Sequence, residues 1–310
     1  MASLAEAQTA VHTGLDPRLP AMSNPPPGTA ITASLPDGRA VAGSVYRSLN
    51  AADAVESLWE PRTVWEFSPL IGDTGSAGMA AALAAMRAWL AGDAAEEIAD
   101  PDTAIEVMWP SRDVGVAPAL LGHGFVPMTT LAVRTGRHDD PGAGRAEVDV
   151  RRATMTDLPE LVAIELAELD YSLRVIGGTM RSNAEELLTT ALRRAVFFGG
   201  RVLIAESGGV AVGAVDCGVA SPAPGSSIEY RLREGRWGYV GTLSVVPAAR
   251  GTGVGRVLMA AAHAMLAADA DAGTYLFYDL ANPLSSAFWP RQGYRPLWTK
   301  WVCKPAARMR

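Results

Sequence analysis

Three glycines, Gly251, Gly253 and Gly255, alternate with other residues between a predicted strand and a predicted helix. Glycine has no Cβ, so the backbone N–H groups of such a turn can approach a ligand closely. The N-terminus of the helix that follows adds unpaired N–H donors and the positive end of the helix dipole. These features suit a phosphate or a pyrophosphate. The residue types and their spacing therefore predict an anion-binding turn at the start of a helix.

The flanking residues predict the elements that hold this turn. Residues 237–246 have the β-branched and aromatic content of a buried strand, and Pro247 ends it because proline donates nothing to a sheet ladder. Residues 257–268 are rich in Ala, Leu and Met and predict a helix. The spacing fits neither a Rossmann turn nor a Walker loop. A dinucleotide-dependent oxidoreductase, with Asp279 as the ribose-binding acid, stays open as an alternative.

The run from Leu243 to Arg256 resembles the acyl-CoA loop of the GNAT superfamily of N-acyltransferases. The family pattern is Val-x-Pro-x-x-Arg/Gln-x-x-Gly-x-Gly/Ala, and the residues that fill it here are Val245, Pro247, Arg250, Gly253 and Gly255. Residues 282–294 are similar to the family's second signature, which has an Asn, a short helix, an aromatic pair and a Gly-aromatic step. Both motifs occur in the family's order.

The resemblance implies an N-acetyltransferase that uses acetyl-CoA as its cosubstrate. It implies that the backbone near Leu243 and Val245 pairs with the pantetheine arm, and that an N–H near Val245 polarises the thioester carbonyl. The turn would hold the pyrophosphate. The residues expected to bind the cosubstrate are Leu243, Val245, Arg250, Gly251, Gly253, Val254, Gly255, Arg256, Asn282 and Ser285.

The catalytic residues are where the sequence departs from the family. An amine of pKa about 10.4 needs a base before it can attack. The family's usual Glu is absent, and Tyr239 stands about where it would be; Glu229 and Asp216 are the nearest carboxylates in the sequence. Trp289 takes the place of the family's acidic Tyr, and an indole cannot serve as a titrating acid. We predict that Tyr239, Glu229 and Trp289 are the catalytic residues, and a non-catalytic acyl-CoA sensor remains the main alternative.

Composition narrows the class of protein. The chain has 310 residues, of which 49% are hydrophobic, and a net charge of −6. That balance argues against nucleic acid or an anionic membrane as a partner. Two cysteines and four scattered histidines predict neither a disulfide framework nor a metal site. No signal peptide or membrane-spanning run is visible, so we expect a cytoplasmic protein.

The chain also contains a weak internal repeat. Gly43 and Gly213 lie in similar strands at an offset of 170, and Gly124 and Gly293 begin similar segments at an offset of 169. The repeat predicts an α/β (α+β) fold with two GNAT-like lobes, each a mixed, mostly antiparallel sheet flanked by helices, with the N-terminal lobe truncated. The predicted parts are a flexible tail or arm at 1–28, a degenerate lobe at 29–137, a linker at 138–145 and a catalytic domain at 146–310.

The first copy has lost the chemistry of the turn. Its counterpart, residues 71–78, has no Arg or Gln and places Asp73 where pyrophosphate would bind, so one acyl-CoA per chain is expected. We expect the acceptor to be a small-molecule primary amine, a metabolite or an antibiotic, bound between the lobes near Glu165 and the loop 221–236. The Ala, Gly and Arg content is typical of GC-rich bacteria. The protein is expected to be a monomer, as a pseudo-dimer of lobes, or a homodimer.

Overall fold

The computed structural model describes residues 3–22, 27–136, 147–198 and 201–310. The described strands form one sheet in the order β1-β2-β3-β4-β11-β5-β10-β9-β8-β7-β6. The strands are β1 (Thr29–Ser34), β2 (Ala40–Leu49), β3 (Thr63–Leu70), β4 (Thr103–Pro110), β5 (Val126–Arg134), β6 (Asp149–Arg152), β7 (Arg201–Ser207), β8 (Val210–Ala220), β9 (Trp237–Val245), β10 (Gly273–Asp279) and β11 (Arg295–Cys303). The helices are α1 (Leu4–Leu15), α2 (Gly75–Asp93), α3 (Ala95–Ile98), α4 (Ala117–Gly122), α5 (Leu158–Ile176), α6 (Ala184–Phe197), α7 (Val254–Leu266) and α8 (Pro283–Arg291).

The sheet contains the same topology twice, which confirms the predicted two-lobe fold. In the first half β1, β2 and β3 are antiparallel and β3 pairs in parallel with β4. In the second half β7, β8 and β9 are antiparallel and β9 pairs in parallel with β10. The second lobe adds β6, α5 and α6 before this unit, whereas the only described helix before β1 is α1.

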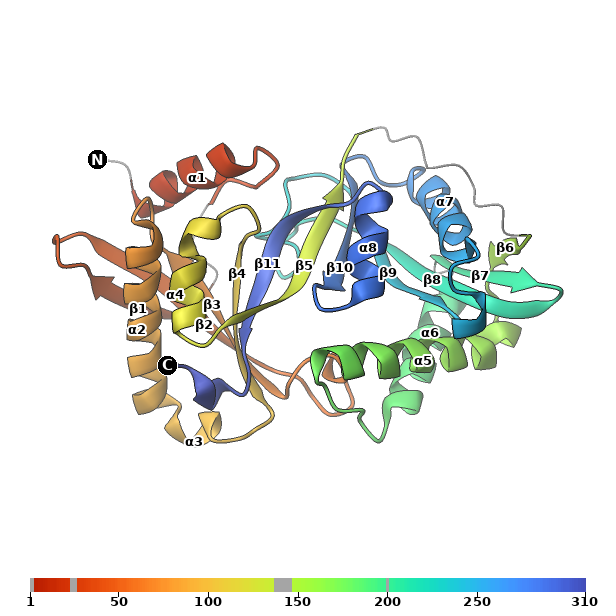
Figure 1. Ribbon diagram of the computed structural model, residues 1–310, viewed down its shortest axis with the longest axis horizontal. Coiled ribbons are helices and arrows are strands. Elements are labelled where there is room, and N and C mark those ends of the chain that lie inside the picture. The colour runs from red at the N-terminus through yellow and green to blue at the C-terminus, as the bar shows by residue number, and fades with distance from the viewer. Residues whose placement is uncertain (1–2, 23–26, 137–146, 199–200) are drawn as a thin grey trace.

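The last strand of each lobe lies in the other lobe. β5 pairs with β10, the parallel strand of the second lobe, and β11 pairs with β4, the parallel strand of the first. β5 and β11 also pair with each other, so the two sheets become one. Figure 1 shows both strands running through the middle of the molecule. The lobes are therefore contiguous in space but not in sequence.

Helices cover both faces of the sheet. Alternate residues of a strand point to opposite faces, and on β8 Ala214 packs in a cluster with α5 and α6 while Val215 packs in a cluster with α7. The equivalent core of the first lobe joins α2 and α4 to Trp65 and Phe67 of β3. Figure 1 shows α2 and α4 over the first lobe and α7 and α8 over the second. No helix of the described residues is long and apolar enough to cross a membrane.

The N-terminal segment differs from the prediction of a flexible tail. Residues 4–15 form α1, which begins with a capping box between Ser3 and Glu6. The buried Gln8 side chain anchors the helix to the end of β3: its Nε2 donates to Pro69 O at 3.1 Å, and its Oε1 accepts from Ile71 N at 2.7 Å. A helix held by such buried bonds is part of the lobe, because breaking them would leave backbone groups unpaired. The predicted linker at 138–145 lies outside the described residues.

Candidate active site

The two parallel strands of the second lobe separate beside the predicted cosubstrate residues. β9 pairs with β10 only as far as Tyr239 and Tyr275, whereas its pairing with β8 continues to Val245. Val246 N donates to Val212 O on β8 at 3.0 Å. Because N–H directions alternate along a strand, the N–H groups of Val245 and Leu243 point the other way, into the gap. β9 therefore offers an open backbone edge.

This edge leads directly into the glycine turn. Gly251 and Gly253 have φ values of 80° and 107°, a region that side chains with a Cβ rarely adopt. Gly253 is the N-cap residue of α7, and no side chain caps that helix. The first N–H groups of a helix have no partner within it, so they remain donors for a ligand. The predicted residues from Gly251 to Arg256 thus come together at one helix N-terminus.

Arg250 lies at this turn, but its side chain points toward α5. Its Nε donates to Val245 O at 3.0 Å, and its guanidinium lies 5.1 Å from the centre of the Tyr171 ring and 3.7 Å from a carboxylate oxygen of Glu168. These contacts fix the geometry of the turn and tie it to α5. A direct contact of Arg250 with the cosubstrate stays a prediction.

The second predicted motif forms the start of α8. The buried Asn282 accepts hydrogen bonds from the N–H groups of Leu284 and Ser285 at 3.0 and 3.3 Å, so it is the N-cap of this helix. Ser285 is half-buried in the first turn. The Asn of the motif therefore has a structural role here, as the N-cap of α8. Cosubstrate binding by Asn282 and Ser285 stays a prediction.

Trp289 belongs to the hydrophobic core under α7 and α8. Its ring packs against Phe288 and Tyr294 at centroid distances of 5.0 and 5.6 Å. Its indole N–H has no hydrogen-bond partner among the described residues. Next to it, Tyr294 OH lies 3.0 Å from His263 Nε2, so this histidine is part of a buried structural network. The geometry accounts for Trp289 by packing alone.

A carboxylate lies where β9 is irregular. Val215 pairs with Leu243 and Cys217 with Val240, so Asp216 of β8 faces the two residues Gly241 and Thr242. The side chain of Asp216 accepts a hydrogen bond from Thr242 N. A Cβ at position 241 would collide with this carboxylate, which explains the glycine there. The bulge therefore brings Asp216, a partly buried side chain, to the point where β9 leaves β10.

Glu165 of α5 is the second carboxyl of this site. It is buried, and both burial and the charge of Asp216 raise its pKa above the ordinary range for glutamate. Burial likewise raises the pKa of Asp216, against the effect of the Thr242 hydrogen bond. Because the charge of Asp216 disfavours ionisation of Glu165, Glu165 keeps its proton more readily than an ordinary glutamate when Asp216 is ionised. Such a pair can accept a proton from an ammonium group.

Tyr239 lies beside this pair, whereas the described contacts of Glu229 are with its own loop. Burial first, and then the charge of Asp216, raise the pKa of the Tyr239 hydroxyl, so this group remains protonated. It can donate a hydrogen bond or relay a proton, but it cannot act as a base near neutral pH. Glu229 accepts from Gly225 N at 2.7 Å and lines a cavity under α1 with Gln8. The catalytic roles of Tyr239 and Glu229 stay predictions.

The burial of Glu165 had a signal in the sequence. Leu161, Glu165, Leu169 and Leu173 recur every four residues and are all buried on α5. A glutamate within an apolar stripe is expected to be buried, and a buried glutamate needs a partner or a function. The sequence alone places Glu165 near the acceptor but does not pair it with Asp216, because the two lie on different elements.

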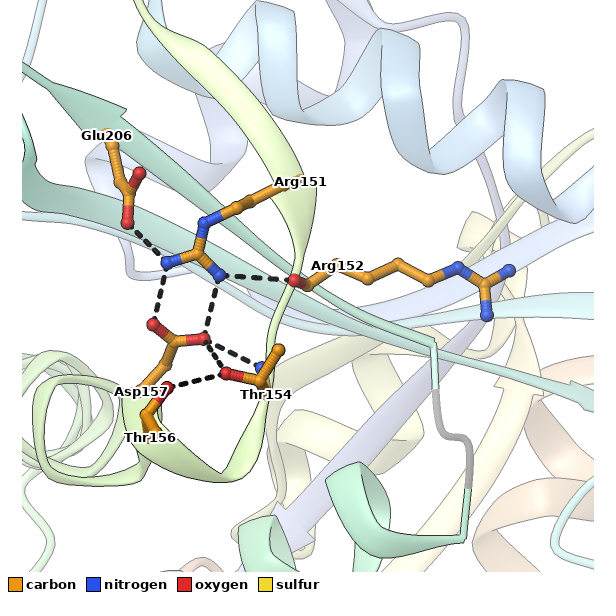
Figure 2. A network of polar contacts seen from close by, with 6 residues as sticks. All are labelled: Arg151, Arg152, Thr154, Thr156, Asp157 and Glu206. Carbon is orange, nitrogen blue, oxygen red and sulfur yellow. Dashed lines mark hydrogen bonds and ion pairs between the residues drawn. The ribbon is translucent and has the colours of Figure 1, made fainter.

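A polar network fixes the start of α5 on the sheet (Figure 2). Arg151 of β6 donates to both carboxylate oxygens of Asp157, at 2.7 and 2.8 Å, and to Glu206 of β7 at 2.5 Å. Asp157 also accepts from Thr154 N at 2.7 Å, in a capping box. The network thereby sets the position of the helix that carries Glu165.

A cavity of about 240 Å³ lies between α5 and the end of β9. Its walls include Ile164 and Ala167 of α5, Val245 of β9, and Arg250 of the turn. The elements that hold the predicted cosubstrate residues therefore also enclose free volume next to them.

Comparisons with known proteins agree with this geometry. Residues 198–296 match the model of the family described as "Acetyltransferase (GNAT) domain". This range covers the whole unit from β7 to α8, including the glycine turn. No curated protein matches.

Several solved structures share the fold. A GCN5-related N-acetyltransferase from Sphaerobacter thermophilus aligns with a TM-score of 0.55 and 13% identity, over 89% of this chain and 81% of its own. An acetyltransferase of the GNAT family from Colwellia psychrerythraea aligns with a TM-score of 0.50 and 10% identity, over 98% and 97%. A tandem GNAT protein from the clavulanic acid biosynthesis pathway aligns with a TM-score of 0.48 and 16% identity, over 96% and 87%.

The first two likenesses extend over both lobes and concern the fold. The family match concerns the second lobe and includes the motif residues of the turn. It favours the acyltransferase over the dinucleotide alternative, and Asp279 is in addition engaged by Thr129 of β5, whose Oγ1 donates to it at 2.7 Å. The C-terminal lobe therefore contains a region, residues 198–296, that matches the GNAT acetyltransferase domain, and the chain as a whole shares its fold with GNAT acetyltransferases.

Proposed function

We propose that the C-terminal lobe transfers an acetyl group from acetyl-CoA to a primary amine of a small molecule, by direct attack. The observation that carries this proposal is the open edge of β9, with the N–H groups of Leu243 and Val245 directed into the gap. A donor edge of this kind suits the amide groups of pantetheine. The uncapped N-terminus of α7 at its end suits the pyrophosphate.

The carboxyl pair supplies the proton acceptor for the reaction. The ionised member of Asp216 and Glu165 takes a proton from the acceptor's ammonium group, and the free amine then attacks the thioester carbonyl. A backbone N–H near Val245 stabilises the negative charge that develops on the carbonyl oxygen. The C–N bond forms, the C–S bond breaks, and CoA leaves as a thiolate; the second proton, which the nitrogen loses as it becomes an amide, goes to this thiolate or to water. With a thiol pKa of about 8.5 the thiolate needs no strong acid, which is compatible with Trp289 in the acid's place.

We infer one acyl-CoA site per chain. In the first lobe, Pro69 has the register position that Val245 has in the second, opposite Gly43 and Gly213 respectively. Proline has no N–H, so this edge lacks the corresponding donor. Gln8 already bonds the neighbouring backbone, and Asp73 would repel a pyrophosphate.

Isothermal titration with acetyl-CoA tests this assignment. We expect a stoichiometry near one for the wild type and no binding for Gly253→Glu, which places a negative charge and a side chain at the N-terminus of α7. Gly75→Glu is the matched control, because Gly75 also has a positive φ, of 59°, at the start of α2 in the first lobe. Binding by Gly253→Glu, absence of binding by the wild type, or a stoichiometry near two would contradict the proposal.

An acceptor screen tests the small-molecule claim. CoA release is followed by thiol detection, with aminoglycosides, amino acids, polyamines and histone-like peptides side by side. Efficient turnover of peptides alone would contradict a small-molecule acceptor. If acetyl-CoA binds and nothing turns over, the non-catalytic sensor becomes the better function, and the observation that favours it is the packing of Trp289 in the core.

A further inference from the structure

A second, larger cavity lies at the far end of α5. Its volume is about 690 Å³, within the range of small-molecule sites. Its apolar walls come from Val126 and Met128 of β5, Val302 of β11, and Ile176 at the end of α5. The cavity thus lies where the exchanged strands of the two lobes meet the helix that carries Glu165.

The charged side chains of this cavity all have the same sign. Lys304, Arg308 and Arg310 line it, and no aspartate or glutamate does. Within the described part of the chain, neither Lys304 nor Arg308 lies within ion-pair distance of a carboxylate, and both side chains are exposed. Asp102, next to the cavity wall, is bound by both terminal nitrogens of Arg181, at 2.8 and 3.0 Å.

This basic cavity contrasts with the chain as a whole. The protein has a net charge of −6, so a cluster of cations around one cavity departs from its average surface. The charge of Lys304 also lowers the pKa of Asp102 and Glu60, but neither carboxylate lines the cavity. Cations around a concave site attract an anion and bind it with charge-assisted hydrogen bonds. Carboxylates and phosphates are the anions that lysine and arginine recognise best.

The cavity is connected to the active site by two elements. Along α5, Ile176 in the cavity wall follows Glu165 by 11 residues, about 16 Å at 1.5 Å per residue. On β5, Met128 O accepts from Leu280 N at 2.8 Å, directly after β10. The distance of about 16 Å along α5 sets the length that a ligand in contact with both places must have.

We propose that this basic cavity binds a carboxylate or phosphate group of the acceptor, at the end opposite its reactive amine. The inference rests on the proposed function and narrows its substrate class to elongated amines with an anionic end. Lys304 and Arg308 hold the anion, and the apolar walls contact the chain between the two ends.

Direct binding tests the cavity without any reaction. Inorganic phosphate and glutarate are titrated against the wild type and the double variant Lys304→Gln/Arg308→Gln. We expect the Kd of the variant for at least one of the two anions to be higher by about tenfold or more, because charged hydrogen bonds are lost. Arg193→Gln/Arg194→Gln, two exposed arginines on α6, is the control that changes net charge equally. Equal binding by the wild type and both variants would overturn the proposal.

Kinetics then identify the group and its distance from the amine. The substrates are ω-amino carboxylates of increasing chain length, each paired with its amide, and phosphoethanolamine paired with ethanolamine. We expect Lys304→Gln/Arg308→Gln to raise KM about tenfold or more for the longer acids or the phosphate, with kcat and the amide reactions unchanged. Equal effects on acids and amides, or a wild-type preference for amides, would overturn the proposal. If acetyl-CoA does not bind but the anion titration still distinguishes the variants, the proposed function fails while the basic cavity stands.

Discussion

The two lobes share one topology but differ at the equivalent strand ends, β9 in the second lobe and β3 in the first. In the second lobe, Val245 ends β9 with an N–H directed into an open gap. In the first, Pro69 has that register position on β3, and Gln8 of α1 bonds its carbonyl. Proline in place of valine removes the N–H donor, and Gln8 forms hydrogen bonds with the backbone groups that remain at this strand end. The proposed cosubstrate site therefore depends on a few backbone groups that differ between the lobes, rather than on the topology that they share.

The same comparison applies to the proton acceptor. Applying the offset of the repeated strands, 170 residues, to Asp216 gives Tyr46 on β2, a side chain that is 50% exposed. Among the described residues, the first lobe has no counterpart of α5, so none of them corresponds to Glu165. Both features on which the proposed reaction depends, the donor edge and the carboxyl pair, are therefore found only in the second lobe of the described structure.

The largest expected effect comes from removing the carboxylate that only the second lobe has. Asp216→Asn should lower kcat by about 10²–10⁴, the contribution of general acid–base catalysis. Acetyl-CoA affinity should stay within a few-fold. Thiol release and titration calorimetry measure the two quantities. Tyr46→Phe, at the equivalent position, should leave both unchanged. A kcat of Asp216→Asn near that of the wild type would show that Asp216 is not the proton acceptor that distinguishes the second lobe from the first.

The pH dependence sharpens this test. The base works only when ionised, so kcat/KM should decrease as the pH falls through the raised pKa of Asp216, well above the ordinary value of about 3.9. Because folding raises the pKa of both carboxyls, the free energy of unfolding should decrease as the pH rises through the same range. In Asp216→Asn/Glu165→Gln this pH dependence should weaken; an unchanged slope would contradict the role of the pair.

A smaller effect is expected from opening the first lobe. Gln8→Ala leaves Pro69 O and Ile71 N without their partner, so it should lower the free energy of unfolding by about 1–3 kcal/mol. Urea denaturation measures this loss. Acetyl-CoA stoichiometry should remain near one, even in Gln8→Ala/Asp73→Ser, because Pro69 still has no N–H. A second binding site in the double variant would mean that α1 alone closes the first lobe.

The smallest effect on turnover is expected at Trp289. If the indole only fills the core, Trp289→Phe should change kcat far less than the 10²–10⁴ expected for a catalytic acid. Its melting temperature should fall, because Phe leaves part of the space between Phe288 and Tyr294 empty. Thermal unfolding and thiol release at saturating acetyl-CoA measure these changes. A loss of kcat as large as that of Asp216→Asn would give Trp289 a catalytic role.

Local patterns explain what could be predicted from the sequence. The glycine turn, its strand and its helix depend on neighbouring residues, and the repeat follows from similar strands at a constant offset. For residues 1–28 the alternatives were a flexible tail and an arm over the first lobe; α1 fits the arm, and Ser3 and Glu6 have the spacing of the capping box that begins it. The Glu165–Asp216 pair joins a helix and a strand, and such contacts depend on tertiary packing, which no local pattern specifies.

The exchange of β5 and β11 has a consequence for how the protein is made. A ribosome completes β11 after every other strand, yet β11 belongs between β4 and β5 of the first half. Until then the edges of β4 and β5 have no partner, and unpaired edges are sites of association with other chains. The first lobe cannot complete its sheet before β11 has been made, so the two lobes must finish folding together. The strand exchange that joins the lobes therefore makes folding of the first lobe depend on a strand that is synthesised after it.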